Sequence, residues 1–165
     1  MPLLITLIRF FLIFPTLYFL ERDSRLLAFF LVLFAGLSDW LDGEVARKTN
    51  NTSRVGALLD PMVDKAFVLS VLSFFLYVKD VQLLAFVLLL LRELFLSFLR
   101  SLAVEKGYVM KASYLGKAKA FFEFLTLLSL CLGLGLSSTL LWLSVAFAYL
   151  SLYDYMLKYL TFERR

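Results

Sequence analysis

The sequence contains no histidine and a single cysteine, Cys131, among its 165 residues. Without histidine, no imidazole can serve as a general base or as a metal ligand. The lone cysteine excludes an internal disulfide and a Cys/His zinc site. Only 18% of the residues are charged. Any chemistry must therefore depend on carboxylates, Lys or Arg, hydroxyl groups, or a bound metal.

Apolar residues dominate the composition of the chain. Hydrophobic residues make up 62% of the chain, and 18 residues are phenylalanine. A soluble domain of this length could not bury so much apolar surface, so we expect the solvent around the protein to be lipid. The net charge of +4 comes from basic residues at helix ends and within apolar runs. This placement indicates membrane topology and argues against a nucleic-acid partner.

Six apolar stretches are each long enough to cross a bilayer, which takes about 20 helical residues. They cover residues 4–20, 26–46, 56–78, 81–104, 114–136 and 139–160. Lys and Arg are more frequent in the segments that would face the cytosol if both termini were cytosolic. We therefore predict an all-α integral membrane protein, in which residues 1–165 form one domain, a bundle of six transmembrane helices with both termini in the cytosol.

Five of the six stretches place a charge at a similar depth. With a rise of about 1.5 Å per residue, Arg9 and Arg92 lie roughly 17 Å from the outer ends of their helices. By the same measure Asp39 and Asp64 lie at roughly 20 Å, and Lys119 at roughly 26 Å. The outer half of the membrane holds nothing comparable. The agreement in depth predicts one polar cavity that opens to the cytosol.

Four aspartates stand at the ends of two consecutive predicted helices. Asp39 and Asp42 are three residues apart, and Asp60 and Asp64 are four apart, so each pair lies on one helix face. Antiparallel helices joined by a short loop would bring the two pairs together. Carboxylates that close need a cation, and a ligand set made only of oxygen suits Mg²⁺, Mn²⁺ or Ca²⁺. Two such ions are typical of displacement at phosphorus.

Two other interpretations of these acids stay open at this point. The aspartates could form structural salt bridges with Arg47, Lys65 or Arg92. Alternatively, acids and bases inside a membrane could line the pathway of a cation or proton transporter. A transporter needs polar groups that can be reached from both faces of the membrane, and the outer halves of these stretches offer almost none.

The stretch from Asp39 to Asp64 resembles the signature of the CDP-alcohol phosphatidyltransferases. The matching positions are Asp39, Asp42, Gly43, Ala46, Arg47, Gly56, Asp60 and Asp64. The resemblance implies transfer of a phosphatidyl group from CDP-diacylglycerol to an alcohol, with release of CMP. It also implies a homodimer in a bacterial-type cytoplasmic membrane, with its active site facing the cytosol.

The same resemblance implies a role for each of these residues. Asp39, Asp42 and Asp60 would bind the metal ions, Mg²⁺ or Mn²⁺, and Asp64 would complete the metal site and act as the catalytic base. The CDP-diacylglycerol-binding residues would be Gly43, Ala46, Arg47, Ser53 and Gly56. The metal site would then hold two ions against the pyrophosphate of the lipid nucleotide.

A second region, residues 92–123, resembles the corresponding part of the bacterial phosphatidylglycerophosphate synthases. The shared positions are Arg92-Glu93, Arg100, Ala112-Ser113, Gly116-Lys117 and Lys119. Ala120 and Glu123 depart from that pattern, which has Thr and Gln there. The resemblance implies sn-glycerol 3-phosphate as the acceptor.

The charges of this region agree with an anionic acceptor. Arg92, Arg100, Lys117 and Lys119 would provide four cations for a phosphate group. Inositol 1-phosphate would present the same phosphate, and phosphatidylglycerol is the acceptor in a cardiolipin-type enzyme, so the basic residues alone do not rank these three. Two alternatives also stay open: the lysines could contact lipid headgroups, and Arg92 could be paired with Glu93, Glu123 or the aspartates.

Overall fold

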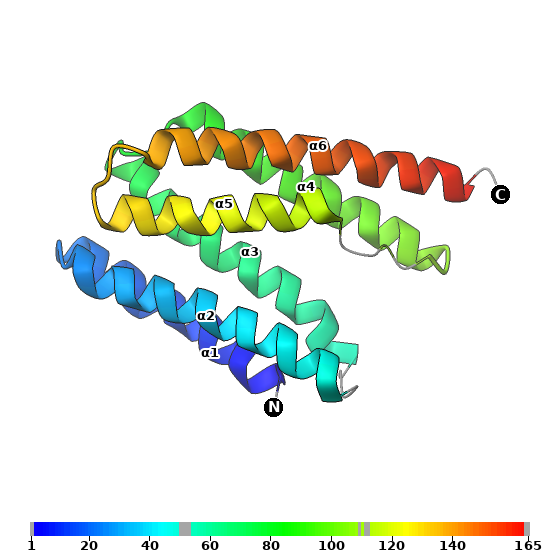
Figure 1. The fold of residues 1–165 in the computed structure, drawn as a ribbon, viewed down its shortest axis with the longest axis horizontal. Coiled ribbons are helices and arrows are strands. Elements are labelled where there is room, and N and C mark those ends of the chain that lie inside the picture. Colours follow the sequence, from blue (N-terminus) through cyan, green and yellow to red (C-terminus); the bar gives the residue numbers. More distant parts are fainter. Residues whose placement is uncertain (1, 50–53, 109, 111–112, 164–165) are drawn as a thin grey trace. The chain divides into compact units, whose positions relative to one another are not determined.

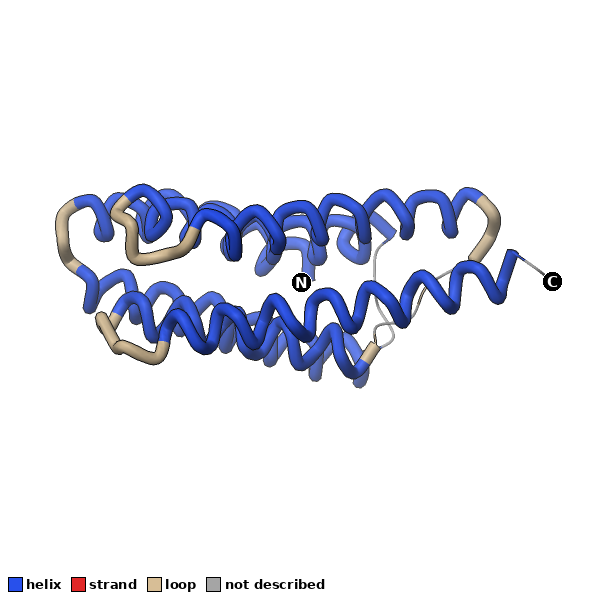
Figure 2. Tube along the Cα trace, turned by 90° about the horizontal axis from the view of Figure 1, so that it is seen from above, coloured by secondary structure: helices blue, strands red, loops and turns tan. Residues whose placement is uncertain are grey.

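The computed structural model describes the backbone of residues 2–49, 54–108, 110 and 113–163, and the side chains of 6–38, 62–108, 110 and 113–163. In this part of the chain all regular structure is helical, and no strand is present (Figures 1 and 2). The helices are α1 (Pro2–Glu21), α2 (Arg25–Thr49), α3 (Arg54–Tyr77), α4 (Leu83–Glu105), α5 (Tyr114–Cys131) and α6 (Ser137–Glu163).

These six helices coincide with the six predicted stretches, with one clear difference. The sequence predicts that the fifth stretch continues to residue 136, whereas α5 ends at Cys131. Gly133 adopts a positive φ of 65°, a left-handed conformation that glycine accepts without strain and that ends a helix. The predicted boundary was wrong because an apolar "LGLGL" run reads as a membrane span although its glycine stops the helix.

Four helices end in the same hydrogen-bonded turn. Behind α1, α3, α4 and α5, a backbone N–H bonds the carbonyl five residues earlier, and the preceding N–H bonds the carbonyl three residues earlier. The residue whose N–H forms the second of these bonds has a positive φ: Asp23, Lys79, Gly107 and Gly133. This turn satisfies carbonyl groups that the end of a helix would otherwise leave unpaired.

The chain forms two compact units. Unit 1 consists of residues 1–80 together with 127–135, and unit 2 consists of residues 81–126 together with 136–165. Each unit has its own buried apolar residues.

In unit 1, α1 packs against both α2 and α3. Ala28 and Val32 of α2 and Val71 and Phe75 of α3 are completely buried. At the end of unit 1 where α1 joins α2, Arg25 forms an ion pair with Asp80, with 3.4 Å between Nη1 and Oδ2. This pair ties the α1–α2 turn to the turn that follows α3.

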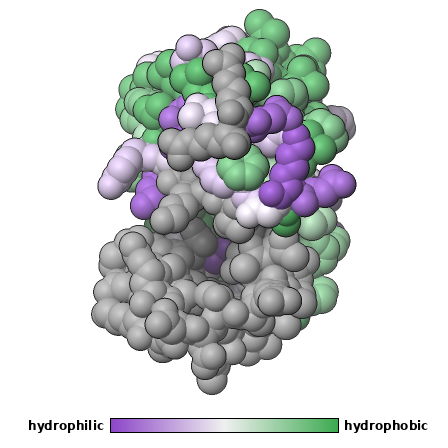
Figure 3. Space-filling view, turned by 90° about the vertical axis from the view of Figure 1, so that its right-hand side faces the viewer, coloured by the Kyte–Doolittle hydropathy of each residue, from purple (hydrophilic) through white to green (hydrophobic). Residues whose placement is uncertain are grey.

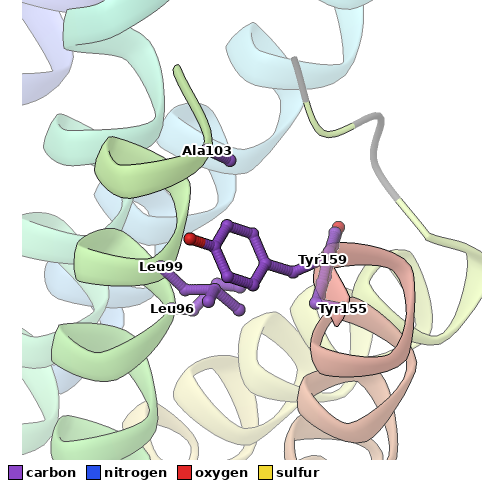
Figure 4. Packing of buried hydrophobic residues seen from close by; sticks show 5 residues of the cluster. All are labelled: Leu96, Leu99, Ala103, Tyr155 and Tyr159. Carbon is purple, nitrogen blue, oxygen red and sulfur yellow. The ribbon is translucent and has the colours of Figure 1, made fainter. Parts of the chain in front are cut away.

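In unit 2, α4 packs against α6, and one buried cluster joins the two helices. It contains Leu96, Leu99 and Ala103 of α4 with Tyr155 and Tyr159 of α6, and the two tyrosine rings project from α6 among these residues (Figure 4). The ring of Phe122 on α5 stacks on that of Phe147 on α6, with 5.2 Å between the centroids. Aromatic and aliphatic contacts therefore hold the three helices of unit 2 together.

The distribution of side chains differs from that in a typical soluble protein. Large apolar side chains such as Phe11, Phe14, Leu94 and Phe98 are exposed, whereas several Arg, Lys and Glu side chains are buried. The coloured surface in Figure 3 shows broad hydrophobic areas and a smaller area where hydrophilic residues gather. Among the described residues, α6 is the helix that is both long and apolar enough to span a membrane by itself.

Candidate active site

The four aspartates lie on the two helices that the sequence predicts. Asp39 and Asp42 belong to α2, and Asp60 and Asp64 belong to α3, so the three-residue and four-residue spacings place each pair on one helix face. The side chains of Asp39, Asp42 and Asp60 lie outside the described residues. Asp64 is the predicted metal ligand whose side chain the structure describes.

Asp64 forms an ion pair across two helices of unit 1. Its carboxylate accepts a hydrogen bond from Nη1 of Arg9 on α1. The Arg9 side chain is only 5% exposed, whereas that of Asp64 is 39% exposed. The carboxylate therefore has a buried guanidinium as one partner and is itself partly exposed.

Arg9 is a site residue to which the sequence assigns no role. The sequence places Arg9 at a depth close to that of Arg92 and of the aspartates. Depth alone does not identify the residue with which Arg9 interacts. The structure supplies the partner, because α1 packs against α3 and places Arg9 beside Asp64.

The predicted CDP-diacylglycerol-binding residues can be located only in part. Gly43, Ala46 and Arg47 lie on α2, and Gly56 lies on the first turn of α3. Their side-chain environments are outside the described residues, as is Ser53 altogether. Their roles stay predictions.

The four predicted phosphate-binding cations, all in unit 2, fall into two groups. Arg92 and Lys119 form the first group, and both are buried. Arg92 donates a hydrogen bond to Glu93. The Lys119 Nζ lies 2.7 Å from Oε1 of Glu93 and 2.6 Å from Oε2 of Glu123. Arg92, Glu93, Lys119 and Glu123, here called the charge quartet, carry two positive and two negative charges.

Further hydrogen bonds hold Arg92 against α6. Its Nε donates to the carbonyl of Ala148 at 3.1 Å, and its Nη2 donates to Oγ of Ser151 at 2.5 Å. The Ser151 hydroxyl in turn donates to the same Ala148 carbonyl at 2.8 Å. The charge quartet thus joins α4, α5 and α6, and its cations are neutralised by neighbouring carboxylates.

Arg100 and Lys117 form the second group. None of the ion pairs between described residues includes either of them. Arg100 donates to the hydroxyl of Tyr155 at 3.1 Å, and the Lys117 Nζ lies 5.6 Å from the ring centroid of Tyr114. These two cations keep their charge available for an anion.

The donors present suit a hard divalent cation. The predicted ligands are all carboxylates on helical positions, and the one described carboxylate, Asp64, is accessible and already faces a cation on one side. Oxygen ligands of this kind favour Mg²⁺ or Mn²⁺ over softer metals. An uncompensated guanidinium such as Arg100 suits a phosphate, because its N–H groups can donate to two oxygens at once.

Comparison with known proteins places the chain in a family. A family model described as CDP-alcohol phosphatidyltransferase matches residues 1–150. A CDP-diacylglycerol–glycerol-3-phosphate 3-phosphatidyltransferase of Aquifex aeolicus is 38% identical over 130 residues, which cover 78% of this chain and 73% of that protein. The protein of the same name from Haemophilus influenzae is 34% identical over 133 residues, covering 76% and 72%.

A relative with a different name matches a shorter part of the chain. A Mycobacterium tuberculosis protein named "Putative cardiolipin synthase" is 37% identical over 92 residues. These residues cover 55% of this chain and 44% of that protein.

Proposed function

The chain belongs to the CDP-alcohol phosphatidyltransferase family, and from this premise we propose that it transfers the phosphatidyl group of CDP-diacylglycerol to sn-glycerol 3-phosphate. The products are phosphatidylglycerophosphate and CMP. The family match over residues 1–150, which includes the complete aspartate signature, carries the proposal. The names of the Aquifex and Haemophilus relatives, which align with over 70% of their own lengths, support the choice of acceptor.

The reaction is a displacement at the phosphorus that bears the diacylglycerol. The hydroxyl oxygen of the acceptor forms a bond to this phosphorus, the bond from phosphorus to the CMP oxygen breaks, and the hydroxyl proton is released. Asp64 accepts that proton, because it is a carboxylate with an accessible side. The Arg9 guanidinium holds the carboxylate from the interior and so fixes the direction from which it meets the hydroxyl.

Asp39, Asp42, Asp60 and Asp64 would hold the divalent ions, two Mg²⁺ or Mn²⁺. Bound there, the metal supplies charge neutralisation for the pyrophosphate and for CMP as it leaves. Gly43, Ala46, Arg47, Ser53 and Gly56 would bind the CDP part of the lipid. The small residues among them allow the nucleotide to approach the helix backbone closely.

The phosphate of the acceptor binds to the basic residues of unit 2. All four predicted cations contribute positive potential, but Glu93 and Glu123 offset the charges of Arg92 and Lys119. Direct contact with the phosphate therefore depends most on Arg100 and Lys117. Inositol 1-phosphate would make the same contacts. Phosphatidylglycerol is the remaining candidate acceptor, and the relative named after cardiolipin synthesis is the reason to test it.

The proposed setting is a bacterial-type cytoplasmic membrane, with six spans, both termini in the cytosol and the active site facing the cytosol. Outward-facing Phe and Leu side chains and inward-facing charges support lipid as the surrounding solvent. We also propose that residues 1–165 act as one domain and that two copies form a homodimer.

The direct test is CMP release by the purified protein with Mg²⁺ or Mn²⁺, CDP-diacylglycerol and a panel of acceptors. The panel contains sn-glycerol 3-phosphate, inositol 1-phosphate, phosphatidylglycerol and serine. We expect a clear preference for sn-glycerol 3-phosphate and complete loss of CMP release when a chelator is added. Preference for another acceptor would overturn the proposed substrate, and activity that survives the chelator would overturn the metal site.

The substitution Asp64→Asn tests the proposed base. We expect CMP release to fall by about 10²–10⁴-fold, the usual contribution of a positioned acid or base. The matched control is Asp154→Asn, because Asp154 is also a helical aspartate but pairs locally with Lys158 at 2.7 Å. Full activity of Asp64→Asn, or an equal loss in both variants, would refute the role given to Asp64.

A further inference from the structure

We propose that Tyr155 is a positioning residue for the acceptor phosphate, which holds the Arg100 guanidinium and the first turn of α5 in one fixed arrangement. The inference rests on the proposed function, in which Arg100 and Lys117 contact that phosphate. It adds a residue that neither the aspartate signature nor the basic region of the sequence contains.

The hydroxyl of Tyr155 connects three helices of unit 2. Tyr155 lies on α6 and is 1% exposed. Its oxygen accepts a hydrogen bond from the backbone N–H of Ser113 at 2.9 Å and another from Nη2 of Arg100 at 3.1 Å. Ser113 directly precedes α5, and Arg100 belongs to α4. One buried oxygen therefore fixes a basic side chain and a helix start that are 13 residues apart in the chain.

The ring of Tyr155 provides a second contact with Arg100. The guanidinium carbon lies 5.1 Å from the centroid of the ring, within the range of a cation–π interaction. The ring and the hydroxyl together restrain the guanidinium group of Arg100. Among the described residues, the Nη2 contact with Tyr155 is the only hydrogen bond that Arg100 makes to a side chain, so Nη1 keeps its donors for an anion.

Ser113 transmits the position of Tyr155 to Lys117. The hydroxyl of Ser113 accepts the N–H of Gly116 at 3.0 Å, and its carbonyl accepts the N–H of Lys117 at 3.1 Å. A Cβ atom at Gly116 would lie 3.2 Å from the Ser113 Oγ and 3.6 Å from the Tyr155 hydroxyl oxygen. The turn that carries Lys117 is therefore in contact with Tyr155, and Gly116 avoids a tight contact with the Ser113 hydroxyl.

This arrangement lowers the cost of binding a small anion. Long basic side chains lose rotational freedom when they bind a ligand, and that loss weakens binding. Tyr155 imposes the restriction before the acceptor arrives. Because Tyr155 does not touch the reacting phosphorus in this scheme, its loss should weaken acceptor binding and leave the chemical step nearly unchanged.

A purely structural role for Tyr155 predicts a different result. Its ring belongs to the buried cluster with Leu96, Leu99 and Tyr159 (Figure 4), so a substitution that removes the ring would disturb α4 and α6 together. Tyr155→Phe keeps the ring in this cluster and removes only the hydroxyl. It therefore separates packing from positioning.

The test compares Tyr155→Phe with the matched variant Tyr149→Phe. Tyr149 also lies on α6, and its hydroxyl donates to the carbonyl of Leu88 on α4 at 3.2 Å. Tyr149→Phe therefore removes a hydrogen bond between α4 and α6 that does not involve Arg100. For Tyr155→Phe we expect KM for sn-glycerol 3-phosphate to rise about tenfold, with kcat and KM for CDP-diacylglycerol within about twofold. Tyr149→Phe should leave all three values unchanged.

Two further measurements complete the test. In an Arg100→Ala background, Tyr155→Phe should raise the acceptor KM by much less than tenfold, because the part of its effect that depends on Arg100 is already lost and only the part that depends on Lys117 remains. The protection of the protein against thermal unfolding by inorganic phosphate should require a higher phosphate concentration in Tyr155→Phe, and this readout needs no turnover.

The possible outcomes separate this inference from the proposed function. If the wild-type protein prefers another phosphate-bearing acceptor, the proposed substrate fails, and the KM for that acceptor and the phosphate protection still test Tyr155. An unchanged acceptor KM and unchanged phosphate protection in Tyr155→Phe would overturn the inference. So would equal losses of activity and unfolding temperature in Tyr155→Phe and Tyr149→Phe, because these indicate packing alone.

Discussion

The buried charges of the two units differ in how far their carboxylates are covered. In unit 2, the side chains of Glu93 and Glu123 are both 5% exposed and lie against Arg92 and Lys119. In unit 1, the Asp64 side chain is 39% exposed although its partner, Arg9, is only 5% exposed. Both arrangements pair acids with bases, but among these three described carboxylates Asp64 is the one that is partly exposed.

This difference separates an acid that can act on a substrate from acids that hold helices together. A buried carboxylate is stable only while its cationic partners remain, so the charge quartet ties α4, α5 and α6 to one arrangement. The Asp64 side chain is less completely covered, which lowers the cost of its charge relative to a fully buried carboxylate. Substitutions in the two units should therefore differ in whether folding or activity is lost first.

Removal of Glu93 should give the largest loss of stability. Glu93→Gln leaves Arg92 and Lys119 buried with Glu123 as the only remaining acid of the charge quartet, and breaking a buried pair typically costs about 3–5 kcal/mol. We expect a much lower unfolding temperature in detergent and poor recovery of folded protein. The matched control is Glu105→Gln, an exposed residue at the end of the same helix. Similar unfolding temperatures of the two variants would show that the charge quartet does not hold unit 2 together.

Removal of Arg9 should cost less stability and more activity. In Arg9→Gln the Asp64 carboxylate loses the buried donor of this ion pair, so we expect a loss of about 1.5–3 kcal/mol, the usual contribution of a hydrogen bond to a charged group. CMP release should fall further than this loss of folding explains, because the carboxylate is no longer oriented. Arg9→Lys should restore part of the activity through its charge.

The control for Arg9 is Arg22→Gln. Arg22 is exposed just beyond the end of α1, where its guanidinium carbon lies 5.5 Å from the ring centroid of Tyr18. This variant should match the wild-type protein in both unfolding temperature and CMP release. An Arg9→Gln variant with normal activity would show that Asp64 needs no support from α1.

The sequence predicts the helices well because each depends on a local pattern. An apolar run of about 20 residues and the three- and four-residue spacings of the aspartates can be read without tertiary structure. The error in the predicted end of α5 also has a local cause, because the left-handed conformation of Gly133 ends the helix within an apolar run. Family resemblance supplied the signature residues and their roles.

Contacts between distant residues are what the sequence could not supply. Arg92 and Lys119 were predicted to bind phosphate, with acid pairing as the open alternative for Arg92 and headgroup contact for Lys119. The ion pair between Lys119 on α5 and Glu93 on α4 needs the tertiary structure, since the two residues are far apart in the chain. Tyr155 gave no signal, because nothing in its local pattern distinguishes it from the other tyrosines. Its importance comes from meeting Arg100 and Ser113 across helix boundaries.

The smallest effect is expected at the exposed pair between Lys106 and Glu163, which joins the ends of α4 and α6. The hydrogen bond with Glu163, followed by that with Tyr159, raises the pKa of Lys106 above its ordinary value. A raised lysine pKa contributes stability that is fully present below the unfolded value of about 10.4 and disappears as the pH rises through the folded value. The pair therefore adds no pH dependence near neutrality.

Lys106→Gln should leave the unfolding temperature within error of the wild type at neutral pH, because exposed ion pairs are screened by water and salt. Thermal unfolding at low and high salt checks this, and a loss as large as that of Arg9→Gln would mean that exposure does not set the strength of the ion pairs in this protein.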